Sequence, residues 1–226
     1  MEPVTLRPAV AVMAKVPGAT TVKSRLHPSI TPERATELYR CFLLDRLDAL
    51  AALPGIAPVI AFTPDDARSA LEALAPPGFA LVPQRGADLG QRLANLLADL
   101  VGRGHPASIA IDSDSPTLPM AYVLEAALKL ESSAADVVLG PCDDGGYYLI
   151  GVREPRPEIF EGIPWSSERV TPVTLEKARG LGLRVHLLPS WFDVDTEADL
   201  RRLHGELAAG RDGPARTRAF VGTIYR

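Results

Sequence analysis

The sequence has little of what marks several common protein classes. Aromatic residues make up only 6% of its 226 residues, there are two cysteines, and the net charge is −4. No apolar run approaches the ~20 residues that cross a bilayer, and the first residues lack the basic-then-apolar pattern of a signal peptide. The negative charge gives no reason to expect nucleic acid or an anionic membrane as a partner.

The few cysteines and histidines also narrow the range of possible protein classes. Cys41 and Cys142 stand far apart, so we expect free thiols and a cytoplasmic protein. The four histidines show no metal-ligand spacing. Hydrophobic residues make up 46% of the chain, enough for one sizeable core. We therefore expect a single domain over residues 1–209 and a C-terminal tail over 210–226, a surface segment that can pack back on the domain.

Short apolar runs alternate with longer amphipathic ones along the chain. This alternation predicts an α/β domain with a mostly parallel sheet and helices on both faces. The expected strands cover 9–14, 57–63, 79–83, 108–112, 135–141, 147–152 and 184–189. The expected helices cover 31–50, 64–75, 88–104, 120–133, 171–182 and 196–208.

Two aspartates follow the apolar run at 109–111. In parallel sheets, ligands bind outside the carboxyl ends of the strands, which is where Asp112 and Asp114 stand. On an extended backbone, residues two apart point to the same side, and two carboxylates there suit Mg²⁺. Alternatively, one of them only caps the turn before Pro116.

The loop after the first expected strand is basic. It carries Lys15, Lys23 and Arg25, with Gly18 in the turn. A cationic loop that contains glycine, at the end of a strand, is a candidate phosphate cradle, although neither the Walker A nor the dinucleotide glycine spacing is present. The alternative is a solvated basic loop.

A second acidic pair, Asp193 and Asp195, precedes the last expected helix. Thr196 and Asp199 have the spacing of a capping box, which explains Asp199 but not the pair before it. The pair can complete a metal site with Asp114.

A glycine-containing turn separates the strands expected at 135–141 and 147–152. Asp144, Gly145 and Gly146 either only join the two strands or let a ligand approach the backbone closely. Tyr147 and Tyr148 alternate faces, so at most one of them points into a site.

Six motifs in this order resemble those of a bacterial transferase family with the nucleotide-diphospho-sugar transferase (GT-A) fold, whose members are commonly labelled glycosyltransferases. The motifs are AKVPGATTVKSRL, QRGADLGQRL, DSDSPTLP, GPCDDGGYYLIG, IPWSS and DVDTEADL, and the resemblance covers residues 9–207. The opening VKSRL…SITPERA and the ending DVDTEADL also resemble those of 2-phospho-L-lactate guanylyltransferases, and the pattern is more distantly similar to that of molybdenum-cofactor nucleotidyltransferases.

The resemblance implies a role for each matching position. For metal binding (Mg²⁺ or Mn²⁺) it implies Asp114, Asp193 and Asp195. For nucleotide binding it implies Lys15, Gly18, Lys23, Arg25, Gln84, Leu89, Gly90, Arg92, Asp112 and Ser113. For the acceptor it implies Asp144, Gly145, Gly146, Tyr147, Trp165 and Ser166. The residues expected to act in catalysis are Lys15, Lys23, Arg25, Asp114 and Asp144.

The sequence departs from the family at two positions. Asp112 and Thr20 stand where the family usually has glycine, and threonine does not tolerate every backbone shape that glycine does.

Three functions follow as expectations. The first is nucleotidyl transfer from a nucleoside triphosphate to a small phosphorylated or anionic acceptor, favoured by the three basic residues of the first loop. The second is glycosyl transfer from a nucleotide-diphospho-sugar to a small acceptor, with Asp144 as base. The third is a non-catalytic nucleotide-binding module.

Overall fold

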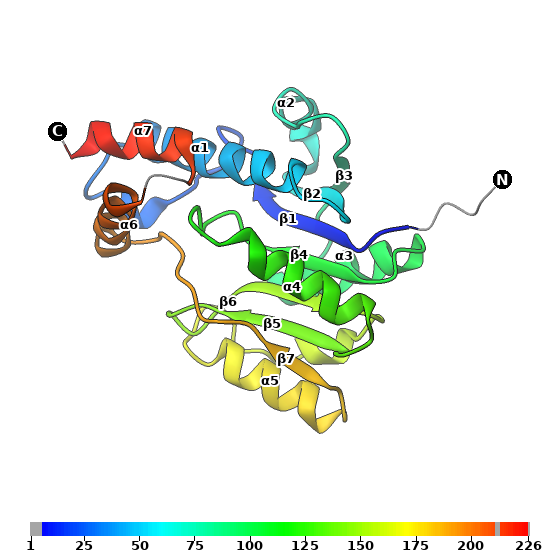
Figure 1. Cartoon of the computed structure of the whole chain (residues 1–226). Helices are drawn as coiled ribbons and strands as arrows, with labels where there is room; N and C mark the ends of the chain where they lie inside the picture. Colours follow the sequence, from blue (N-terminus) through cyan, green and yellow to red (C-terminus); the bar gives the residue numbers. More distant parts are fainter. Residues whose placement is uncertain (1–5, 211–212, 226) are drawn as a thin grey trace.

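A seven-stranded mixed sheet forms the centre of the computed structural model, which describes residues 6–210 and 213–225 (Figure 1). The strand order is β3-β2-β1-β4-β6-β5-β7, and β6 alone runs antiparallel to its neighbours. The strands are β1 (Ala9–Lys15), β2 (Ala57–Thr63), β3 (Ala80–Pro83), β4 (Ser108–Ile111), β5 (Val137–Pro141), β6 (Tyr147–Val152) and β7 (Val185–Leu187). The predicted α/β class with a mostly parallel sheet is therefore confirmed.

Helices cover both faces of the sheet. They are α1 (Pro32–Ala51), α2 (Arg68–Glu72), α3 (Leu89–Gly102), α4 (Met120–Glu131), α5 (Val170–Gly180), α6 (Glu197–Ala209) and α7 (Ala215–Ile224). Three short 3-10 turns, η1 (Ser24–Leu26), η2 (Asp65–Ala67) and η3 (Pro157–Phe160), join them. None of the helices in the described ranges is long and apolar enough to cross a membrane.

The core has three parts. Apolar side chains of α1, α2 and α4 pack on one face of the sheet, and those of α3, η3 and α5 pack on the other. A third cluster joins the outer side of α1 to α6 and α7, which lie together at one end of the molecule (Figure 1). The third cluster matters for the site because it also buries Phe192 and Val194, in the segment that leads past the strand ends to α6.

Two stretches differ from the expected elements. The helix expected over 64–75 is a 3-10 turn followed by the five residues of α2, and Pro76 and Pro77 stand directly beyond it. The stretch expected to be a tail contains α7. The Thr217 amide of this helix donates to the buried Asp45 carboxylate of α1 at 2.8 Å. The sequence did not predict α7 because its amphipathic spacing is weak and because Asp45, which anchors it, lies far away in the sequence.

The capping box expected at 196–199 is confirmed. The Thr196 hydroxyl accepts from the Asp199 amide, and the Asp199 carboxylate accepts from the Thr196 amide. The same carboxylate accepts from the Asp195 amide at 3.2 Å, so the helix start also fixes the acidic residue before it.

Replacing Thr196 by alanine leaves an amide at the start of α6 without its partner. We expect the free energy of unfolding to fall by about 1 kcal/mol, measured by urea denaturation. Thr21→Ala is the control, because Thr21 is exposed and its side chain bonds to nothing in the described ranges. An equal loss in the control would contradict a capping role for Thr196.

Candidate active site

The first acidic segment follows β4, next to the end of β1. The two strands are parallel neighbours with Val12 opposite Ile111, so both carboxyl ends open to the same edge. The Asp112 amide donates to the Tyr148 carbonyl at 2.9 Å, and the Ser113 hydroxyl donates to the Met13 carbonyl at 3.0 Å. Backbone and side-chain bonds therefore fix this segment to the strands on both of its sides.

The second acidic segment reaches the same place by running across the strand ends. Trp191 exchanges backbone hydrogen bonds with Pro141 (3.0 Å) and Asp143 (2.9 Å), at the end of β5. Further along, the Val194 amide donates to the Asp114 carbonyl at 3.0 Å. This last bond joins the two acidic segments, which are eighty residues apart in the sequence.

Lys23 lies between the two segments. Its Nζ is 2.5 Å from Asp114 Oδ1 and 3.0 Å from Asp195 Oδ1. Arg25 lies on the outer side, with a guanidinium nitrogen 3.7 Å from Asp195 Oδ2. Carboxylates that would repel each other are thus held together by one shared ammonium.

The Lys23 side chain is only 3% exposed, whereas those of Asp114 and Asp195 are 38% and 40% exposed. Burial alone would lower the pKa of Lys23, but the attraction of the two carboxylates outweighs it and raises the pKa above its usual range. The backbone of Lys23 has φ of 51°, a left-handed conformation that is unusual for a residue with a side chain. Lys23 is therefore a permanently charged, buried cation.

Asp112 has different surroundings from Asp114. Its Oδ2 accepts from the Ser115 hydroxyl, while Oδ1 is shielded from solvent and has no partner. Burial raises the pKa of Asp112 to about 7, against the opposing attraction of the buried Arg46 guanidinium. The Asp112 and Asp114 carboxylates thus have separate partners rather than acting as one matched pair.

Asp193 faces further acidic groups. One carboxylate oxygen each from Asp193 and Asp144 and the sulfur of the buried Cys142 lie within 4.8 Å of one another. Burial, with repulsion from Asp195 and Asp144, raises the pKa of Asp193 to about 6. This corner of the site is short of positive charge.

A central pocket of about 370 Å³ opens above the β1 and β4 ends. Its charged lining residues are Lys15, Lys23, Arg92, Asp112, Asp114 and Asp195, and Gln84, Leu89, Ser113 and Tyr147 also line it. Lys15 and Arg92 form no ion pair with any residue in the described ranges. The central pocket therefore offers two free cations beside a carboxylate pair, and its volume suits a small molecule.

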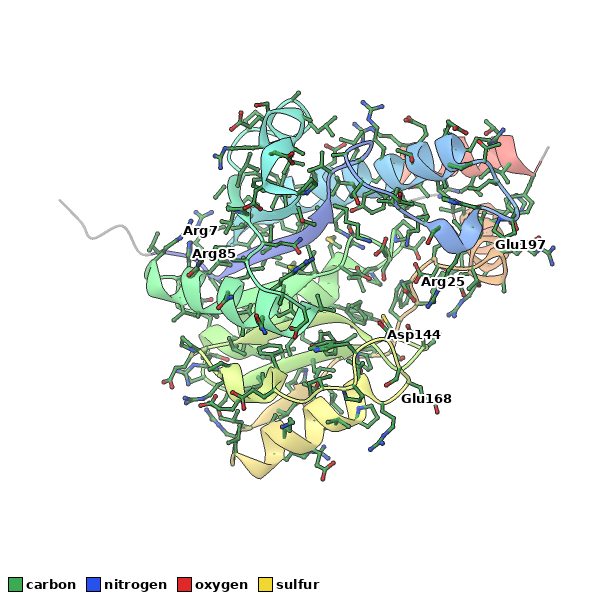
Figure 2. All side chains as sticks on the ribbon, turned by 180° about the vertical axis from the view of Figure 1, so that it is seen from behind. Arg7, Arg25, Arg85, Asp144, Glu168 and Glu197 are labelled. Carbon is green, nitrogen blue, oxygen red and sulfur yellow. The ribbon has the colours of Figure 1, made fainter. Side chains whose placement is uncertain are left out.

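A second pocket of about 400 Å³ shares Leu89, Tyr147 and Asp195 with the central one. Among its other lining residues are Arg25, Asp144, Trp165, Ser166 and Glu168. Arg25, Asp144 and Glu168 lie along one side of the molecule (Figure 2). A ligand in one pocket can thus lie directly beside a ligand in the other.

Two glycines shape the second pocket. Gly145 has φ of 90°, and a Cβ there would lie 2.3 Å from the Glu168 Cα, so the acidic turn and the 168 segment pack backbone to backbone. A Cβ on Gly90 would lie 2.9 Å from the Trp165 ring, so Gly90 makes room for the indole. Gly90 and Gly145 therefore shape the pocket wall through their lack of a side chain.

The structure brings most of the expected site residues to these two pockets. Four of them line neither pocket: Gly90 and Gly145 pack within the wall of the second pocket, Asp193 lies beside Asp144, and Gly18 lines a separate surface hollow beside Thr20. Thr20 does not adopt a positive φ, so the threonine at this position is compatible with the loop as it folds.

Sequence reasoning missed three residues of the site. Tyr39 is buried. Its hydroxyl forms a hydrogen bond with Ser113 Oγ at 2.9 Å and accepts one from the Lys15 amide at 3.0 Å. Arg46 faces Asp112, and Glu168 lines the second pocket. Tyr39 and Arg46 stand seven residues apart on the apolar face of α1, where a buried arginine is a detectable signal.

The donor set fits a divalent cation such as Mg²⁺. Asp114 and Asp195 supply two carboxylates that line the central pocket, and among the described residues Lys23 and Arg25 form ion pairs with them. Hard oxygen ligands suit Mg²⁺, which is held by one or two carboxylates and completed by phosphates and water. Asp144 and Asp193 form a separate group with the Cys142 sulfur.

A family of known sequences matches residues 46–167, and it is described as "Uncharacterized protein conserved in bacteria (DUF2064)". The chain belongs to this family. A proposed nucleotide-diphospho-sugar transferase from Desulfovibrio desulfuricans G20 is similar over 97% of this chain and 98% of its own, with 32% identity and a TM-score of 0.87. No functionally curated protein matches the sequence.

More distant structures share the fold of this DUF2064 protein. The CMP:2-keto-3-deoxy-manno-octonic acid synthetase complexed with CTP has 13% identity and a TM-score of 0.56, covering 89% of this chain and 99% of its own. Molybdopterin-guanine dinucleotide biosynthesis protein A from Archaeoglobus fulgidus has 14% identity and a TM-score of 0.56, covering 89% and 100%. The expected nucleotide-diphospho-sugar transferase fold is confirmed.

Replacing Lys23 by methionine leaves Asp114 and Asp195 facing each other without their shared cation. We expect the free energy of unfolding to fall by about 2 kcal/mol, less than for a fully buried pair because both carboxylates keep contact with solvent. Urea denaturation measures the change. In the control Lys15→Met, which removes an exposed and unpaired lysine, stability should be nearly unchanged; similar losses in the two variants would contradict the structural role of Lys23.

Proposed function

We propose that this DUF2064 protein is a Mg²⁺-dependent nucleotidyltransferase that moves a nucleoside monophosphate from a nucleoside triphosphate to a small acceptor. The observation that carries the proposal is the pairing, in one pocket, of two free cations with a carboxylate pair. The fold shared with a synthetase complexed with CTP and with a molybdopterin-guanine dinucleotide biosynthesis protein supports it. The two free cysteines fit the cytoplasm, where nucleoside triphosphates are abundant.

The proposed donor lies in the central pocket. Lys15 and Arg92 bind its β- and γ-phosphates, and Gln84 and Leu89 are further lining residues that can contact the nucleotide. Asp114 and Asp195 hold the metal. When bound, Mg²⁺ neutralises phosphate charge and positions the α-phosphorus.

The reaction itself needs mainly alignment and charge stabilisation. An acceptor oxygen bonds to the α-phosphorus, the bond from that phosphorus to the bridging oxygen breaks, and pyrophosphate leaves with the electron pair. Lys15 and Arg92 stabilise the charge that develops on the pyrophosphate. Lys23 keeps Asp114 and Asp195 in place throughout, in addition to the phosphate contact expected from the sequence.

Glycosyl transfer is the second candidate. The name of the Desulfovibrio protein favours it, and so does Asp144, an exposed carboxylate in the second pocket that can accept a proton from an acceptor hydroxyl. The donor would then be a nucleotide-diphospho-sugar in the same central pocket.

Lys15→Ala and Arg92→Ala should each weaken triphosphate binding about tenfold and monophosphate binding less, because they remove contacts to the terminal phosphates. Isothermal titration measures both affinities. Arg7→Ala is the matched control, since Arg7 is exposed, stands just before β1 and lines neither pocket. Equal losses for the two nucleotides would contradict the triphosphate assignment.

Asp114→Asn should abolish the part of nucleotide affinity that depends on Mg²⁺. A thermal-shift screen of nucleoside triphosphates against nucleotide-diphospho-sugars, with and without Mg²⁺, reads this out, because a ligand of the native state raises the melting temperature. Asp143→Asn, an exposed carboxylate paired with Arg202, is the control. The metal site is wrong if Asp114→Asn keeps the full Mg²⁺ effect, and stronger shifts with nucleotide sugars would favour glycosyl transfer.

A further inference from the structure

The second pocket carries uncompensated negative charge. Asp195 is already paired with Lys23 and Arg25, which leaves Asp144 and Glu168 as the other charged side chains of the pocket. Both are exposed, and neither forms an ion pair with any residue in the described ranges. Arg25, the one cation of the lining, lies 3.7 Å from Asp195 on a largely exposed side chain, so the lining has three carboxylates against this single cation.

The fold fixes the Asp144 carboxylate and the backbone of Glu168. Asp144 Oδ1 accepts from the Gly146 amide at 2.8 Å, which holds the carboxylate in its turn. The Thr171 amide donates to the Gly145 carbonyl at 2.9 Å, so the turn is tied to the segment that carries Glu168. Both acidic residues therefore belong to one connected wall of the pocket.

The remaining wall is aromatic and hydroxylated. Trp165 and Tyr147 meet edge to face with ring centroids 6.2 Å apart, and Ser166 adds a hydroxyl beside them. Aromatic faces bind the apolar faces of sugars and polyols through dispersion, and they attract cations. A phosphate group placed here would face two carboxylates that lack an ion-pair partner within the described ranges, with Arg25 as the single cation of the lining.

We propose that the acceptor is a hydroxyl compound without a phosphate or carboxylate group, either neutral or carrying an amine. This inference rests on the proposed function and replaces the phosphorylated or anionic acceptor expected from the sequence. The acceptor hydroxyl would bond to the α-phosphorus, pyrophosphate would leave, and the hydroxyl proton would pass to Asp144. Glu168 acts only in binding, by attracting or hydrogen-bonding the acceptor.

The test compares pairs of compounds that differ only by a phosphate. Suitable pairs are glycerol and glycerol phosphate, ethanolamine and phosphoethanolamine, and glucosamine and glucosamine phosphate. Each is titrated into the full chain while tryptophan fluorescence is followed, with and without a non-hydrolysable triphosphate, and Trp165→Phe identifies the signal of the pocket. We expect the unphosphorylated member of at least one pair to bind more tightly than its phosphate.

A charge variant makes the test independent of the identity of the natural acceptor. Glu168→Gln should lower the ratio of unphosphorylated to phosphorylated affinity by about two- to fivefold, as for an exposed charge pair. Glu161→Gln, an exposed carboxylate outside the pocket, should leave the ratio unchanged. Tighter binding of the phosphates, or no binding by any compound, would overturn the inference.

The two proposals fail in different ways. Loss of the donor function would show as absent nucleotide binding in the thermal-shift screen, whereas the acceptor titration without nucleotide reports on the second pocket alone. A protein that binds nucleotides but prefers phosphorylated acceptors would retain the proposed function and refute the acceptor class.

Discussion

The Lys23 ammonium, held between Asp114 and Asp195, is the contact on which the site depends. It joins three segments that are distant in the sequence: the loop after β1, the end of β4 and the approach to α6. Without it, two carboxylates would face each other at the pocket floor. Because Lys23 is buried and the acids are half-exposed, the ion pair fixes the acids while leaving part of each carboxylate accessible from the pocket.

The distribution of charge divides the site into two halves. The central pocket has free cations, Lys15 and Arg92, whereas the second pocket has free carboxylates, Asp144 and Glu168. Asp195 belongs to both. An anionic donor and a non-anionic acceptor would each find complementary charge, and they would meet beside the metal ligands. This distribution of charge also favours binding of the acceptor in the second pocket over binding in the central pocket.

Much of the fold and part of the site could be predicted from the sequence. Strand and helix periodicity predicted the sheet and all the helices except α7, and the strand ends drew attention to Asp112, Asp114, Asp193 and Asp195. Spacing could not show that Asp112 faces Arg46 while Asp114 faces Lys23, because both contacts come from segments far away in the chain. The sequence also could not place Glu168 in the site, because it does not show that Gly145 packs against the Glu168 backbone.

A crystal structure of the wild-type protein with Mn²⁺ and a nucleoside triphosphate tests most directly whether the two acidic segments hold a metal ion against a triphosphate bound by Lys15 and Arg92. Anomalous diffraction locates the metal. We expect an anomalous peak bonded to Asp114 and Asp195, with the terminal phosphates against Lys15 and Arg92. A peak elsewhere, or a triphosphate in the second pocket, would show that the metal or the donor binds at another site.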